Sequence, residues 1–129
     1  MPGRISVQIQ GAESLRDRLR QLSPRIRRAT RKAVEESGAA MERGMKRLAP
    51  VDTGTLRDSI RHEVEDLTAT AGPGDEVDYA IFVEFGTSRM PAQPYVRPVA
   101  EAERHLFPER VRQAVRQETR RGRRGGGGR

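Results

Sequence analysis

The chain has 129 residues, which is enough for one domain with a modest core and too few for two. Only 34% of the residues are hydrophobic and 4% aromatic, so the core must be thin and mainly aliphatic. A thin core indicates that neighbouring subunits complete the burial, although a small helical monomer with a polar surface is the alternative. Cysteine is absent, which excludes disulfides and thiolate zinc sites.

Hydrophobic runs in the sequence are short. None approaches the roughly 20 residues that a membrane span requires, and the N-terminus lacks an apolar signal segment. The sequence therefore predicts synthesis in the cytoplasm and no membrane partner.

The formal net charge of +7 is unevenly divided along the chain. Residues 14–49 carry a net charge of +7, residues 50–119 carry −5 and residues 120–129 carry +5. Unlike faces on one subunit permit the head-to-tail contacts that close into rings. The alternative is that these charges form an ordinary solvated surface.

In chain order, residues 5–9 come first and alternate apolar with polar side chains, which predicts a half-buried strand. A short helix is expected over residues 13–22. Ser23 and Pro24 then match a helix N-cap followed by proline at the first helical position.

A long amphipathic helix is predicted from Pro24 to Leu48. Steps of three and four separate its apolar or small residues, so one face should be buried. Ser37 and Gly38 favour a bend or a close helix contact near its middle. The apolar stripe comprises Leu15, Leu19, Leu22, Ile26, Ala29, Ala33, Ser37, Met41, Met45 and Leu48.

A turn ends the long helix. Pro50 cannot continue the helical hydrogen bonds and biases Ala49 away from helical angles. Asp52, Thr53 and Gly54 supply the side-chain oxygens and the free backbone of a tight turn. One or two further helical turns are expected immediately afterwards.

The next segments have the character of an antiparallel sheet. Residues 60–67 alternate imperfectly, as in an exposed strand, and residues 68–71 continue as a second short strand. Gly72 to Asp75 form a turn. A β-meander fits this part of the chain.

Residues 78–87 hold most of the aromatic side chains. As a strand, this segment places Tyr79 and Phe85 on one face; as a short helix, it gathers Tyr79 and Phe82 and ends at Gly86. Periodicity leaves both alternatives open. In either form the segment is expected to lie against the long helix.

A proline-rich connector leads to the last helix. Residues 90–94 are too rich in proline for regular structure and are expected to be extended, with Tyr95 and Val96 as anchors. Pro98 opens a C-terminal helix, with a kink or restart at Pro108. Its apolar face should comprise Val99, Ala102, Leu106, Val111, Ala114 and Val115.

The predicted fold class is therefore α+β, with an N-terminal strand, a long amphipathic helix, a small antiparallel meander and a C-terminal helix. One domain is expected over residues 1–119. Residues 120–129 contain five arginines and no apolar side chain, which predicts a flexible Arg/Gly tail. The tail either attracts phosphate without reading sequence or simply keeps the protein soluble.

The sequence contains no recognisable catalytic constellation. His62 and His105 have no metal-ligand spacing around them and fit surface or interface positions. No phosphate loop follows the turn at residues 72–75, and no serine stands in a hydrolase elbow. The acidic residues 75–78 do not match a calcium loop and are interpreted as a solvated turn. We expect no enzyme, cofactor or metal site.

Three segments together resemble one protein family. They are LAPVDTGTLRDSI at residues 48–60, DYA with VEFGT at residues 78–87, and MPAQPYVRP at residues 90–98. In this order and spacing they resemble the head-tail joining, or tail completion, family of long-tailed double-stranded DNA phages, prophages and gene transfer agents. The resemblance covers roughly residues 25–115. The arginine-glycine tail departs from the family pattern.

The resemblance implies a structural protein of the virion, located in the neck at the head-tail junction. It implies a homo-oligomeric ring, expected to be a hexamer, between the head-closure protein and the tail terminator and tail tube. The resemblance implies no catalytic residues in this chain.

We expect the connector over residues 86–98 to reach onto an adjacent subunit or ring, with Tyr95 as its anchor. Some of the arginines are expected to line the channel and neutralise DNA phosphates, while an acidic channel that repels DNA is an equally workable alternative. The expected ring interface comprises Pro50, Asp52, Arg57, Glu84, Arg89, Pro94, Tyr95 and Arg97. The expected DNA-channel residues are Arg16, Arg20, Arg27, Arg31, Arg43, Arg120, Arg121, Arg123 and Arg124.

A different class of protein also fits part of the sequence. A small nonspecific nucleic-acid-binding protein would use the basic helix and the arginine-rich tail. It predicts tight, salt-sensitive DNA binding that depends on residues 120–129, and it predicts no ring.

Overall fold

The computed structural model describes residues 5–10, 23–52 and 54–127. It has the predicted α+β class. The elements are β1 (Val7–Gln10), α2 (Pro24–Leu48), α3 (Thr55–Ser59), β2 (Arg61–Glu65), β3 (Thr68–Gly72), α4 (Ala80–Phe85) and α5 (Arg97–Gly127).

Two predictions fall outside the described part of the chain. The short helix expected over residues 13–22 is one of them. The other is the flexible tail over residues 120–129. The backbone of α5 extends to Gly127, but the side chains from residue 122 onward are not described. The boundary of the domain at residue 119 also stays a prediction.

The long helix begins and ends where the sequence predicts. The Oγ atom of Ser23 accepts a hydrogen bond from the backbone N–H of Ile26 at 3.4 Å, and Pro24 takes the first helical position. At the other end, the N–H of Ala49 donates to the carbonyl of Met45 at 2.8 Å, after which Ala49 is extended. The proline at position 50 explains this stop.

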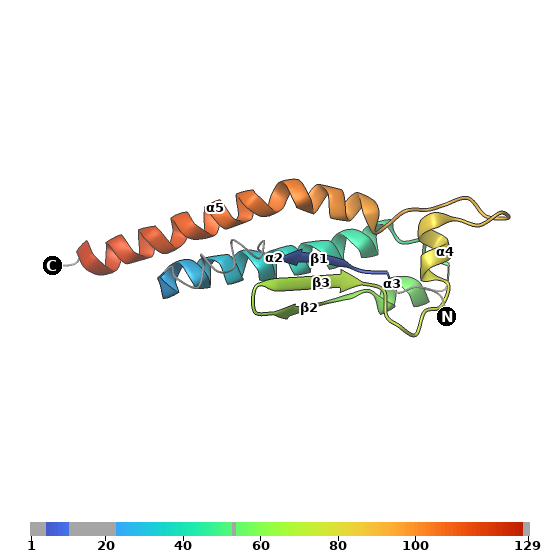
Figure 1. Ribbon diagram of the computed structural model, residues 1–129, viewed down its shortest axis with the longest axis horizontal. Coiled ribbons are helices and arrows are strands. Elements are labelled where there is room, and N and C mark those ends of the chain that lie inside the picture. The colour runs from blue at the N-terminus through green and yellow to red at the C-terminus, as the bar shows by residue number, and fades with distance from the viewer. Residues whose placement is uncertain (1–4, 11–22, 53, 128–129) are drawn as a thin grey trace.

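Helix α2 is the central layer of the molecule. Figure 1 shows α5 running antiparallel to α2 along one side, and the β2–β3 hairpin on the other side. Two glycines of α2 permit this close approach. A Cβ atom at Gly44 would lie 3.1 Å from Val99 of α5, and one at Gly38 would lie 2.8 Å from the ring of His62 in β2.

The sheet has the strand order β1-β3-β2 and is antiparallel throughout. The predicted meander corresponds to the β2–β3 hairpin, and the N-terminal strand adds to the free edge of β3. Asp66 turns the hairpin with a φ of 52°. Ala69 and Ala71 of β3 are fully buried and lie in the main core with Val34 and Met41.

The core is thin and aliphatic, as its composition predicts. Met41, Met45, Ile60 and Tyr95 are among its largest fully buried side chains. A smaller cluster joins α2 to α5 farther along the two helices, through Ala29, Ala33 and Ala114.

The predicted apolar stripe is wrong at its last residue. Leu48 is 47% exposed, whereas Ala49 is buried. The reason is geometric, because the chain leaves helical angles at Ala49 and no longer follows the helical period there.

The C-terminal helix continues through Pro108, so the predicted restart is absent, whereas the alternative of a kink there stays a prediction. Its inner face carries Glu103, which is buried, and Phe107, which packs against the core; the predicted Ala102 and Leu106 are exposed. A buried glutamate can replace an apolar residue here because its charge is paired, as described below.

Within residues 78–87, for which both a strand and a short helix were open, the chain forms a helix, α4, that ends at Gly86. It stands at the end of α2 rather than along it, which corrects the expected packing (Figure 1). Only Ala80 and Val83 of this helix enter the main core.

Candidate interaction surfaces

Five large hydrophobic side chains are exposed at one end of the molecule. Leu48 ends α2, Val51 follows it, Tyr79 precedes α4, and Phe82 and Phe85 belong to α4. Their exposed fractions lie between 43% and 59%. Figure 1 shows the end of α2 and α4 at the same end of the long axis. We call these five residues the apolar end, and exposed apolar side chains gathered in this way are typical of a protein-protein contact.

Sequence reasoning did not identify the apolar end, although a signal for it exists. A helix of six residues can bury only one face, and α4 uses Ala80 and Val83 for that purpose. The aromatic residues Phe82 and Phe85 are therefore left on its outer side. A short helix with aromatic residues on more than one face cannot bury all of them in its own core, and this pattern indicates an interface.

The connector after α4 is a compact loop. Gly86 has a φ of 76°, and a Cβ atom there would lie 2.7 Å from the backbone nitrogen of Ala92. The N–H of Thr87 donates to the carbonyl of Met90, and the N–H of Gln93 donates to the carbonyl of Val83, each at 2.8 Å. The loop therefore returns to α4.

A buried glutamate joins α4 to the start of α5. One carboxylate oxygen of Glu84, Oε1, accepts the backbone N–H groups of Tyr95 and Val96, each at 2.8 Å. The other oxygen, Oε2, accepts the N–H of Arg97 at 2.9 Å and its Nε at 3.2 Å. Glu84 is thus a carboxylate cap for α5, supplied from another helix.

The protonation of Glu84 follows from this geometry. Burial raises the pKa of Glu84, but the hydrogen bonds from Val96, Tyr95 and Arg97 outweigh burial and place the pKa below its ordinary value. The carboxylate is therefore ionised at neutral pH. The guanidinium carbon of Arg97 also lies 5.0 Å from the ring centroid of Phe85, which connects the cap to the apolar end.

The structure places Tyr95, the predicted anchor of the connector, inside its own subunit, and its contact with a neighbouring subunit stays a prediction. Tyr95 is fully buried in its own subunit, and its hydroxyl donates to the carbonyl of Ala80 at 3.2 Å. Burial, followed by the nearby charge of Glu84, raises the pKa of Tyr95. Glu84 is also fully buried and cannot contact a neighbour directly. Both residues hold the connector on its own subunit.

The other residues of the predicted interface are more accessible. Asp52, Arg89, Pro94 and Arg97 are exposed, and Pro50 and Arg57 are half-buried. Arg57 forms an ion pair with Asp58 at 3.2 Å. These residues come from the turn after α2, from α3 and from the connector, so the structure brings them to the same end as the exposed aromatic side chains.

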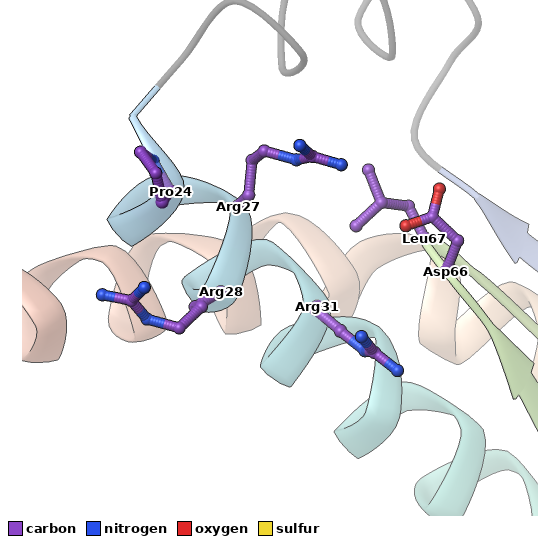
Figure 2. Close-up of a pocket in the computed structure, with 6 residues that line it drawn as sticks. All are labelled: Pro24, Arg27, Arg28, Arg31, Asp66 and Leu67. Atoms are coloured by element: carbon purple, nitrogen blue, oxygen red, sulfur yellow. The ribbon is translucent and has the colours of Figure 1, made fainter.

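The opposite end of the molecule is basic. Figure 2 shows a groove of about 230 Å³ between the start of α2 and the hairpin turn, where Arg27 reaches toward Leu67 and Asp66. Arg28 also lines the groove, although its side chain extends away from Arg27 and Leu67. We call the exposed arginines here the basic end, which comprises Arg25, Arg27, Arg28 and Arg31 of α2 with Arg116, Arg120 and Arg121 of α5.

Helix stability alone does not account for these arginines. The first turn of α2 contains no acidic residue, and arginines near a helix N-terminus oppose its dipole. An acidic residue there would stabilise the helix by about 0.3–1 kcal/mol. Arg31 has a long ion pair with Glu35, 3.6 Å between Nε and Oε1, and both side chains are exposed.

One further predicted channel arginine lies apart from this group. Arg43 is exposed farther along α2, away from the basic end. Arg16 and Arg20 lie outside the described residues, and so do the side chains of Arg123 and Arg124. The structure therefore brings together four of the predicted set, namely Arg27, Arg31, Arg120 and Arg121.

Neither histidine contributes to a metal site in the described part of the chain. His105 is exposed, whereas Nδ1 of half-buried His62 lies 2.8 Å from Oε1 of Glu42. Burial raises the pKa of Glu42, but hydrogen bonds from His62 and Lys46 outweigh it and lower the pKa overall. Residues 5–10, 23–52 and 54–127 contain no group of three potential metal ligands. Within the same ranges, no helix is long and apolar enough to cross a bilayer.

Comparison with known proteins adds a family to this geometry. A family model described as "Bacteriophage HK97-gp10, putative tail-component" matches residues 13–86, more than half of the chain. The match includes α2, the hairpin and α4. No curated protein and no solved structure matches the chain.

Proposed function

The chain belongs to the HK97-gp10-like family of bacteriophage tail components, and from that premise we propose that it completes the tail by forming a ring in the neck. A structural role in the virion follows from the family itself. The ring, expected to have six copies, would lie between the head-closure protein and the tail terminator or tail tube.

The apolar end carries this proposal. Five large hydrophobic side chains exposed at one end are costly for a monomer and are covered in an assembly. The connector adds exposed Arg89 and Pro94 at this end. The apolar end and the connector would dock on the adjacent layer of the neck or tail.

The basic end supports a second contact. Arginines in the first turns of α2 present positive charge at the end opposite to the aromatic residues. In a ring around DNA, they would neutralise phosphates without reading sequence. On this proposal, the arginines bind DNA as part of the ring, and the protein is not an independent nucleic-acid-binding protein.

Deletion of the gene tests the proposed function. In a phage or prophage that encodes this protein, we expect the deletion to yield filled heads and separate tails under the electron microscope. Wild-type protein supplied from a plasmid should restore joined particles. Phe82→Asp should restore few joined particles, whereas Phe82→Leu should restore most of them. Joined, infectious particles in the deletion strain would overturn the proposal.

A further inference from the structure

The hairpin side of the molecule presents acidic side chains that lack internal partners. Residues 61–76 contain one arginine and five acidic residues. The arginine, Arg61, is engaged by Glu76 at 2.7 Å. Glu63, Glu65 and Asp66 are exposed and form no ion pair with any described residue.

A shallow groove of about 250 Å³ lies in this acidic surface. Its lining includes Arg61, Glu63, Asp75 and Glu76 together with Ser6 and Thr70, and Arg61 is already paired with Glu76. Three carboxylates against one guanidinium leave the groove negatively charged, which favours a further cationic group, and a guanidinium can form paired hydrogen bonds with carboxylates. We call this surface the acidic groove.

The α5 side of the molecule has the opposite charge. Residues 104–121 contain six arginines and two glutamates. Arg110 is engaged by Glu103, and Arg112 is engaged by Glu109. The others are exposed and have no acidic partner among the described residues; they are Arg104, Arg116, Arg120 and Arg121.

These two unlike surfaces cannot pair within one subunit. Helix α2 lies between the sheet and α5 and contacts both of them (Figure 1). Unlike surfaces on opposite sides of one subunit can meet only between copies. The contact is then heterologous, which is the kind that generates rings.

We propose that the second half of α5 in one copy docks on the acidic groove of the next copy, with Arg116 and Arg120 facing Glu63 in the groove and Glu65 beside it on the same face of β2. This contact rests on the proposed ring and specifies how its neighbours meet. The occupant is a second copy rather than DNA, because the groove requires a cation and the phosphates of DNA would be repelled by it.

Charge reversal on each side tests the contact. The α5 variant carries Arg116→Glu and Arg120→Glu, and the groove variant carries Glu63→Lys and Glu65→Lys. The groove-side positions pair with Thr70 and Thr68 across the strands, and Arg61 on the same face of β2 is engaged by Glu76. A control with the same charge change as the α5 variant carries Arg43→Glu and Arg47→Glu, which are exposed on α2.

The assembly state is measured by native mass spectrometry on the full-length protein, alone and with its neck and tail neighbours. We expect each variant alone to associate at least about tenfold more weakly than wild type, because like charges then face each other across the contact. The control should assemble as wild type does. A chain that carries all four changes of the two variants should form rings again.

Mixing the two variants gives the sharpest outcome. The α5 variant can dock only on the groove variant and the reverse, so the mixture should form rings that alternate and contain an even number of copies. Variants that assemble alone as wild type does, or a mixture that stays dissociated, would overturn the contact. So would a wild-type protein that remains monomeric in both settings.

The failure of this contact differs from failure of the proposed function. If heads and tails separate when the gene is deleted but the mixture fails to assemble, the neck role stands and this contact is wrong. If the mixture assembles but the deletion strain still yields joined particles, the contact stands and the neck role is wrong.

Discussion

At the scale of single residues, Glu84 determines how the connector and α5 are placed. It is a fully buried carboxylate, and all of its charge is balanced by N–H donors from three consecutive residues and by one guanidinium. An uncapped helix start at this point would leave buried donors without acceptors. The conformation of the loop at the apolar end therefore depends on this side chain.

Replacement of Glu84 by glutamine should destabilise the fold by about 2–3 kcal/mol, because an amide group then faces backbone donors that the carboxylate accepted. Chemical denaturation at pH 7 measures this loss. Glu101→Gln, on the exposed side of α5, is the matched control and should change the free energy of unfolding by less than about 0.5 kcal/mol. Equal losses for both variants would refute the capping role.

The same substitution predicts a pH dependence. The pKa of Glu84 is lowered from its ordinary value of 4.5, so its stabilisation is present above that pH and is lost as the pH falls through the lower folded-state value. The difference in unfolding free energy between wild type and Glu84→Gln should thus be widest near neutral pH and should shrink below pH 4.5. A constant difference down to acid pH would contradict this assignment.

At the scale of elements, a buried polar group joins the two long helices. Glu103 of α5 accepts a hydrogen bond from the hydroxyl of Ser37 in α2 at 2.5 Å, and Arg110 binds both of its carboxylate oxygens at 2.7 and 3.0 Å. Only 3% of the Glu103 side chain is exposed. Removal of one partner leaves an uncompensated buried charge, whereas removal of both charges does not.

Arg110→Ala should therefore cost about 2–4 kcal/mol of stability. The double variant Glu103→Leu with Arg110→Leu should return to within about 1.5 kcal/mol of wild type, since it buries no lone charge. Arg112→Ala breaks the exposed pair with Glu109 and should cost less than about 1 kcal/mol. Thermal unfolding of the four proteins checks this order, and a double variant less stable than Arg110→Ala would contradict it.

The bounds of the helices and strands could be predicted from local signals, but which of their residues are buried could not. Ser23, Pro24 and Pro50 fix the bounds of α2 because capping and proline sterics act within a few residues. The inner face of α5 was mispredicted, since a buried Glu103 is favourable only with a partner seven residues away and another in α2. The connector and its motif were recognised, yet the burial of Tyr95 depends on contacts that no local pattern specifies.

At the scale of the whole molecule, the three surfaces are separated in space. In Figure 1, α4 and the connector lie at one end of the long axis, and the start of α2 lies with the end of α5 at the other. The first of these ends carries the exposed aromatic side chains and the second carries the basic end. The acidic groove is lined by residues of the hairpin and of the turn that follows it. Such a subunit can contact a neighbouring layer through the apolar end, DNA through the arginines of α2, and its own copies through α5 and the acidic groove. This arrangement is what a component at a junction requires.

At this scale, the proposed contact between the basic end and DNA predicts how the salt dependence of DNA binding should change. Arg27→Gln with Arg31→Gln should weaken binding to duplex DNA equally for unrelated sequences. It should also reduce the slope of log affinity against log salt by about 2 per bound subunit, because each phosphate contact contributes about 0.9. Arg47→Gln with Arg89→Gln removes the same charge near the apolar end and should leave the slope almost unchanged. Fluorescence anisotropy over a salt series measures both slopes, and equal reductions for the two variants would show that net charge, rather than the basic end, governs the contact.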